Sequence, residues 1–147
     1  MRKLFILTIF ISSLMMTSMA HAEWTKVVVT KKGYTHYVDF ERIRKHDGKV
    51  YYWELIDLLK PHASGVISAK LYTEVECGRF GYRWLKFTLY KGPMASGTIN
   101  FSSNIPDKDW TYPSPNSSSE AVLKAVCNHK SMQINLGVVS ASDSQTV

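Results

Sequence analysis

The chain has 147 residues, with 18 lysines and arginines, 12 aspartates and glutamates, and a formal net charge of +6. This length fits one domain that owns a hydrophobic core. The basic residues are scattered along the sequence, so we interpret them as a solvated surface rather than a nucleic-acid or heparin-binding patch, and we expect no nucleic-acid partner.

A secretory signal is predicted at the N-terminus. Arg2 and Lys3 precede an apolar stretch, and an Ala-His-Ala sequence ending at Ala22 supplies the small residues that a signal peptidase accepts. Serines and a threonine interrupt the apolar stretch, which favours a cleaved signal over residues 1–22 rather than a membrane anchor. No cysteine stands at the cleavage point, so we expect no lipid attachment and a periplasmic or secreted location.

The sequence contains two cysteines, Cys77 and Cys127. In an oxidising compartment an even count predicts a disulfide, and two cysteines allow one intramolecular pairing. Their wide separation does not fit a metal pair or a redox CxxC site. Closing a loop of this length stabilises a fold by roughly 4 kcal/mol in the chain-entropy model.

The mature chain begins with a predicted β-hairpin. Residues 24–30 and 34–39 are rich in β-branched and aromatic residues, and Gly33 lies in the turn between them. Residues 39–43 resemble one short helical turn that Asp39 is able to cap.

Longer strands follow the hairpin. Residues 49–59 carry apolar side chains on both faces, which predicts a strand in the middle of a sheet covered on both sides. Residues 67–77 alternate between apolar and polar and place Cys77 on the core side. Residues 80–90 and a short segment at 98–101 bring the number of predicted strands to about six.

One helix is predicted near the C-terminus, after a loop at 102–117 that is rich in Ser, Pro, Asn and Asp. Ser117 and Glu120 form a capping-box pattern before apolar residues at helical spacing. A disulfide through Cys127 would pin this helix onto the core face of the sheet. We therefore expect an α+β domain over residues 23–128, with about six strands in one antiparallel sheet, one packed helix, and a polar tail at 129–147.

A set of residues, taken in their order along the chain from Trp24 to Asn128, also resembles the surface-adhesin protein E-like family of Gram-negative bacteria. The resemblance rests on this set: Tyr37-Val38-Asp39, Val50 to Trp53, Asp57, Ser68-Ala69-Lys70, Glu76-Cys77, Arg83, Tyr90, Gly92-Pro93-Met94, Gly97, Trp110, Pro115, Ser117 and Ala125-Val126-Cys127. It implies a six-stranded antiparallel sheet with a disulfide-linked C-terminal helix.

The resemblance also implies a function. The founding adhesin of the family is a dimeric surface lipoprotein that binds host matrix and plasma proteins such as vitronectin and laminin. It carries a basic loop before the strand that ends in its first cysteine. The same stretch of this chain offers Lys60, His62 and Lys70 as candidate ligand residues. The chain lacks the lipidation cysteine, so cell-surface display does not follow from the sequence.

No catalytic constellation is recognised, and we expect no enzyme activity, metal or cofactor. Glu74 and Glu76 share a strand face, which we interpret as solvated rather than as a catalytic carboxylate pair. The histidines lack metal-binding or catalytic spacing: His36, His46, His62 and His129. We interpret His36 as an ordinary strand residue.

An aromatic sheet face is the feature with most functional promise. Five residues are expected to gather there if the strand registers allow: Tyr51, Trp53, Tyr82, Trp84 and Tyr90. Such a face suits a homodimer or ligand interface, unless loops such as 102–117 cover it. We expect an exported, non-enzymatic binding or adhesion module; the alternative is a periplasmic structural or accessory protein with no host ligand.

Overall fold

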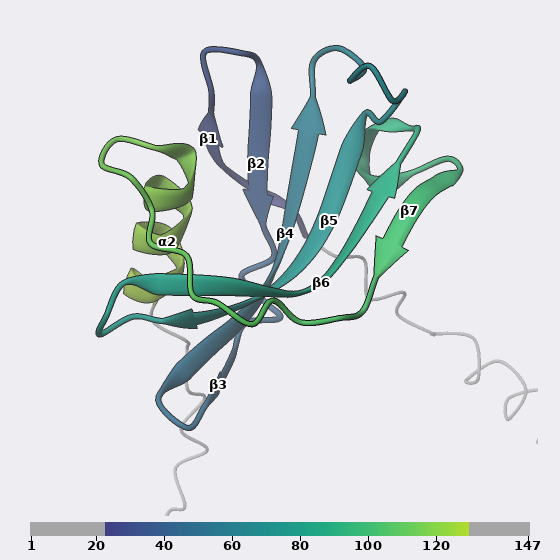
Figure 1. The fold of residues 1–147 in the computed structure, drawn as a ribbon. Helices are drawn as coiled ribbons and strands as arrows, with labels where there is room; N and C mark the ends of the chain where they lie inside the picture. Colours follow the sequence, from purple (N-terminus) through teal and green to yellow (C-terminus); the bar gives the residue numbers. More distant parts are fainter. Residues whose placement is uncertain (1–22, 130–147) are drawn as a thin grey trace, which may run out of the picture.

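The structure, a computed structural model, describes residues 23–129 (Figure 1). It contains one antiparallel sheet of strand order β1-β2-β4-β5-β6-β7, with the short β3 paired to β4. The strands are β1 (Thr25–Val29), β2 (Tyr34–Val38), β3 (Arg44–His46), β4 (Lys49–Leu58), β5 (Ser68–Glu76), β6 (Gly81–Tyr90) and β7 (Ile99–Ser103). A 3-10 turn, η1 (Pro93–Ala95), precedes β7, and helix α2 (Ser118–Asn128) follows it. The predicted signal at 1–22 and the tail beyond His129 lie outside the described residues.

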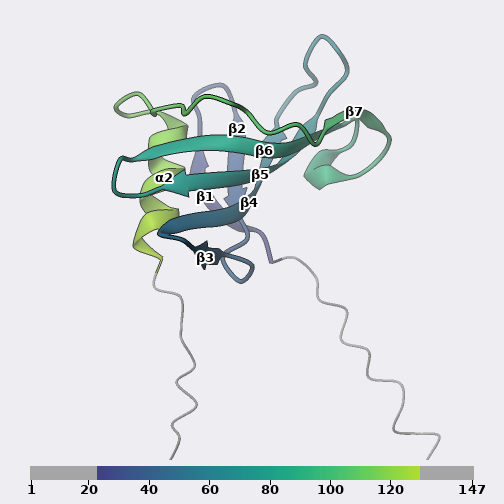
Figure 2. The same cartoon turned by 60° about the horizontal axis from the view of Figure 1, so that its bottom comes forward.

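Helix α2 packs on one face of this sheet, against β1, β2 and β4 (Figures 1 and 2). Successive strand residues point to opposite faces, so the strand register separates two surfaces. We call the surface beneath α2 the helix face; its core residues are Val38, Val50, Tyr52 and Val75. We call the opposite surface the open face; its residues include Tyr51, Trp53, Lys70, Tyr72, Glu74 and Arg83.

A disulfide holds α2 to the sheet. Cys77 follows β5, and it pairs with Cys127 near the end of α2, with 5.7 Å between the two Cα atoms. Apolar side chains of α2 complete the core: Val122, Leu123 and Val126. The predicted α+β fold, the helix on one face and the disulfide pairing are all confirmed.

The helix begins at the residue that the capping pattern predicts. Ser117 is the N-cap, and its Oγ accepts a hydrogen bond of 3.2 Å from the backbone N–H of Glu120. The Glu120 carboxylate accepts from the N–H of Asn116 at 2.6 Å, one residue earlier than in a full capping box. The first contact satisfies one orphan donor of the helix, and the second ties the Glu120 side chain to the residue before the cap.

The segment after β2 differs from the sequence prediction. Residues 40–42 form a turn rather than a helical turn, because the Asp39 carboxylate accepts a hydrogen bond from the N–H of Arg42 at 3.2 Å. The chain then forms β3, which pairs with the start of β4 and which the sequence analysis did not predict. The expected helical turn was therefore wrong, although the capping role of Asp39 fits the turn.

Two loops cover parts of the open face. The η1 segment folds over the ends of β4 and β5, where the N–H of Met94 donates to Asp57 at 2.8 Å and that of Ala95 donates to Ser68 at 2.9 Å. Leu55, two residues before Asp57 on the same face of β4, is fully buried. Apart from this contact and the loop that carries Trp110, the open face has no second layer within residues 23–129, so the prediction that β4 is covered on both sides holds mainly at this end.

The loop before α2 runs along the free edge of β6. Thr111 and Tyr82 exchange two backbone hydrogen bonds of 2.8 and 2.9 Å, and the N–H of Asp107 donates to the carbonyl of Trp84. This path brings the Trp110 ring to Lys49 and Arg83 on the open face. No helix in the described part of the chain is long and apolar enough to span a membrane.

Candidate binding surface

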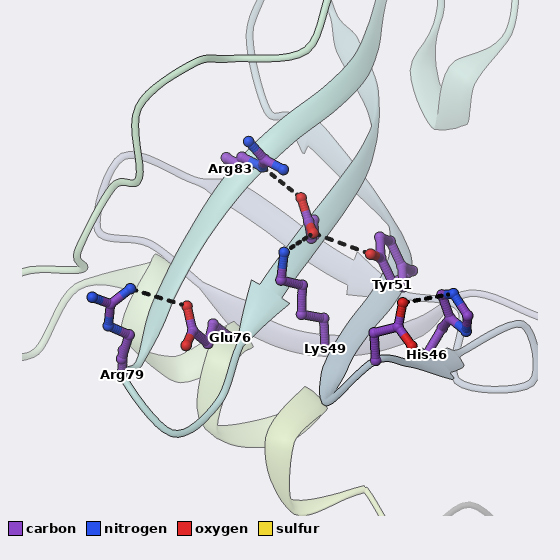
Figure 3. Close-up of polar contacts among 8 residues, drawn as sticks. His46, Lys49, Tyr51, Glu76, Arg79 and Arg83 are labelled. Atoms are coloured by element: carbon purple, nitrogen blue, oxygen red, sulfur yellow. Dashed lines mark hydrogen bonds and ion pairs between the residues drawn. The ribbon is translucent and has the colours of Figure 1, made fainter.

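A buried carboxylate organises one end of the open face (Figure 3). The Glu74 side chain on β5 is 3% exposed and accepts from three neighbours. Lys49 Nζ lies 2.9 Å and Tyr51 Oη 3.0 Å from its Oε1, and Arg83 Nε lies 2.5 Å from its Oε2. Burying a charge is tolerated when the charge is paired and hydrogen-bonded, and this cluster meets that condition.

These donors keep Glu74 ionised. Burial raises the pKa of Glu74, but the hydrogen bonds from Arg83, Lys49 and Tyr51 outweigh it, so the pKa lies below its ordinary value. The interpretation of Glu74 as solvated is therefore wrong. Glu76 does face solvent, with a 32% exposed side chain and one ion pair to Arg79 at 3.5 Å. A carboxylate held ionised in this way is a poor general acid.

A lysine surrounded by aromatic rings lies at the centre of the open face. Lys70 Nζ is 4.7 Å from the ring centroid of Trp53 and 5.9 Å from that of Trp24. The rings of Trp53 and Tyr72 lie 4.8 Å apart, and those of Tyr72 and Tyr51 stack at 6.3 Å. Cation–π attraction and aromatic packing explain why this half-buried lysine stays in place.

Positive charge accumulates around this lysine. Burial lowers the pKa of Lys70, and the charges of Arg42 and Lys86 lower it further, while Asp39 acts in the opposite direction. Asp39 is itself bound to the guanidinium of Arg42. We call the group of Trp24, Arg42, Trp53, Lys70, Tyr72 and Lys86 the Lys70 patch.

The five aromatic residues predicted to share one face are divided between two. β6 carries one extra residue after Trp84, since Thr73 pairs with Trp84 and the preceding Tyr72 pairs with Lys86. Such a bulge reverses the alternation beyond it. Tyr51, Trp53 and Tyr90 therefore belong to the open face, whereas Tyr82 and Trp84 belong to the helix face.

The bulge creates a second aromatic group, at the edge of the helix face far from β1. Phe87 lies between Trp84 and Phe101, with ring centroids 6.4 and 5.6 Å away. Trp84 is 37% exposed and Phe101 is 53% exposed. We call these residues the edge patch.

The predicted ligand loop is also divided. Lys60 and His62 line an open cleft of about 570 Å³ between the β1–β2 turn and the loop after β4, together with Lys31 and Lys32. Lys70 is absent from this lining and belongs to the centre of the open face.

A buried histidine pair lies beneath α2. His36 on β2 and Glu54 on β4 are both buried, and His36 Nδ1 lies 2.7 Å from Glu54 Oε1. Tyr52 donates to the other oxygen of Glu54 at 3.3 Å. The cavity beside them is about 40 Å³, which is room for water but not for a substrate. The pair joins neighbouring strands.

Sequence reasoning missed several members of the Lys70 patch, notably Tyr72, Trp24 and Lys86. Tyr72 could have been predicted from the sequence, because it alternates with Lys70 and Glu74 along β5 and so shares their face. Lys86 was hidden by the bulge, and Trp24 by the absence of any local pattern that links it to β5.

A sheet with a disulfide-linked helix on one side and aromatic and cationic residues on the other defines the architecture. The model of the family described as surface-adhesin protein E matches residues 24–128 of this sequence. The chain belongs to the surface-adhesin protein E family. Among curated proteins, no sequence matches it significantly.

Solved structures share the fold. Protein E of Haemophilus influenzae, in crystal form II, superposes with a TM-score of 0.55 at 14% identity, over 73% of this chain and 88% of that one. A further structure of the protein from non-typeable Haemophilus influenzae gives a TM-score of 0.54 at 14% identity, over 75% of this chain and 78% of that one. At this identity the similarity supports the common fold.

Proposed function

We propose that this chain is an exported, non-enzymatic binding module of the adhesin type, and that its ligand is a host extracellular-matrix or plasma protein. One observation carries the proposal: the open face gathers aromatic and cationic side chains that α2 does not cover. Tyr, Trp and Arg are favoured at protein interfaces. Membership of a surface-adhesin family supports the same function.

The buried polar groups of the domain favour a binding function over catalysis. Glu74 accepts hydrogen bonds from three donors and stays ionised. It therefore links the ends of β4, β5 and β6 rather than binding a substrate. The buried pair of His36 and Glu54 borders a cavity too small for a substrate. These groups stabilise the sheet that presents the surface.

We place a homodimer contact at the edge patch. Trp84, Phe87 and Phe101 form a continuous aromatic group on the sheet edge opposite β1, whereas α2 contacts β1, β2 and β4. Exposed aromatic clusters of this kind are typical of interaction surfaces. This arrangement would leave the open face free for a host ligand.

The test combines binding with location. The purified protein is titrated against immobilised vitronectin and laminin, and intact producing cells are treated with an external protease. We expect saturable binding and loss of the protein from the cells. An absence of saturable binding would contradict the adhesin function, and protection from the protease would favour a periplasmic structural or accessory role instead.

A further inference from the structure

Lys70 is a half-buried ammonium without an ion pair within residues 23–129. Its partners are the rings of Trp53 and Trp24. Desolvating a charge costs free energy, and cation–π contacts compensate for only part of this cost. An anionic group that approaches Lys70 should therefore lower the free energy of the site.

Neighbouring cations make an anionic group near Lys70 still more favourable. Lys86 pairs across the sheet with Tyr72, which places it on the same face as Lys70. Arg42 reaches the area from the turn after β2, where Asp39 neutralises it. Around the aromatic rings the positive charges of Arg42, Lys70 and Lys86 thus exceed the negative charge of Asp39.

The rings limit the kind of anion that fits. A free inorganic anion would use the cations alone, and an apolar peptide would use the rings alone. An acidic sugar uses both, because a carboxylate or sulfate group pairs with an ammonium while the C–H face of the ring packs against an aromatic side chain. Tyr72 supplies such a ring, stacked on Tyr51 and adjacent to Trp53.

We propose that the Lys70 patch binds an acidic sugar of a polysaccharide, with its anionic group on Lys70 between Arg42 and Lys86 and its ring against Tyr72. The inference rests on the proposed function, because it uses the same open face, but it names a carbohydrate rather than a protein as the ligand. It also revises the expectation of a merely solvated basic surface, since β5, β6 and the turn after β2 bring together three cations that are distant in the sequence. A surface adhesin meets such polysaccharides in a host matrix.

The test is isothermal titration calorimetry of the purified protein. The probes are a heparin oligosaccharide, a hyaluronan oligosaccharide, a neutral cello-oligosaccharide and a single-stranded oligonucleotide of the same charge as the heparin probe. We expect saturable, salt-sensitive binding of at least one acidic saccharide, no binding of the neutral one, and weaker binding of the oligonucleotide.

Two matched substitutions locate the site. Lys70→Gln should weaken acidic-saccharide binding by about tenfold, the effect of losing one charge-assisted contact. Lys31→Gln removes the same charge from the exposed β1–β2 turn and should change affinity by less than about twofold. Lys86→Gln removes a second charge from the Lys70 patch and should also weaken acidic-saccharide binding. Thermal unfolding of each variant verifies that it is folded.

Several results would overturn the inference. They are the absence of saturable binding to both acidic saccharides, oligonucleotide binding as tight as theirs, and equal losses in Lys70→Gln and Lys31→Gln. Binding to laminin or vitronectin without saccharide binding would reject this inference and leave the proposed function intact. Binding to an acidic saccharide but to neither laminin nor vitronectin would support this inference and contradict the proposed protein ligand.

Discussion

The ammonium of Lys70 lies 4.7 Å from the ring centroid of Trp53, on the face of the sheet that α2 leaves open. The two residues belong to neighbouring strands, where Trp53 pairs with Tyr72 and Leu55 pairs with Lys70. Lys70 is therefore a diagonal neighbour of Trp53, close enough for a long side chain to reach the ring. The register of β4 and β5 thus produces a charged aromatic surface.

The stability of the open face should depend on Glu74. Glu74→Gln keeps the side-chain shape but leaves Lys49 and Arg83 without their buried counter-charge, so we expect a loss of about 2 kcal/mol in the free energy of unfolding. Urea denaturation measures this change. Glu76→Gln, on the same strand and face, is the control and should cost less than about 0.5 kcal/mol. Equal effects would show that the cluster around Glu74 has no special role.

The same substitution should alter the acid dependence of stability. Burial raises the pKa of Glu74, but its three donors lower it below the ordinary value, so folding favours the ionised form. That stabilisation is complete above the ordinary pKa and is lost as the pH falls through the lowered folded value. The difference in unfolding free energy between wild type and Glu74→Gln should therefore narrow from about pH 7 to about pH 3. A constant difference across this range would contradict the assignment.

Removing the disulfide should destabilise the whole domain. The bridge joins residues separated by 50 positions, so its loss in the double variant Cys77→Ser and Cys127→Ser should cost about 4 kcal/mol by the chain-entropy estimate. Denaturant unfolding of both proteins measures the cost. A reducing agent should lower the stability of the wild type to a similar level and leave the double variant unchanged; sensitivity of that variant to the reductant would contradict this explanation.

The edge patch should control association. Phe101→Lys places a charge at the most exposed ring of the edge patch, and a dimer that uses this surface should dissociate. Light scattering at tens of micromolar should give the mass of a dimer for wild type and of a monomer for the variant. Lys124→Ala, on the exposed side of α2, is the control and should stay dimeric. A wild-type monomer at this concentration would reject the homodimer.

Local patterns made several features predictable from the sequence. The cap at Ser117 depends on residues three positions apart, and the alternation along β5 places Cys77 on the core side. With two cysteines in the sequence, the pairing of Cys77 with Cys127 followed directly. These features need little information from distant parts of the chain.

Features that depend on tertiary pairing were not predictable. The extra residue in β6 after Trp84 becomes visible only when β6 pairs with β5, and it moves Tyr90 to the face opposite Trp84. β3 consists of Arg-Lys-His and has no β-branched or aromatic strand former. It forms because the turn at Asp47 and Gly48, both with positive φ, returns the chain to β4.

The most direct test of the open face as a ligand surface is the affinity of matched variants for laminin and vitronectin, measured by biolayer interferometry. Tyr72→Ala, at the centre of the Lys70 patch, should weaken binding by about tenfold or more. Tyr112→Ala makes the same truncation at a 58% exposed residue outside the patch and should bind like wild type. Lys86→Glu and Lys31→Glu give the corresponding comparison for charge. Binding that is unchanged in Tyr72→Ala and Lys86→Glu, with both variants folded, would contradict the assignment of the open face as the ligand surface.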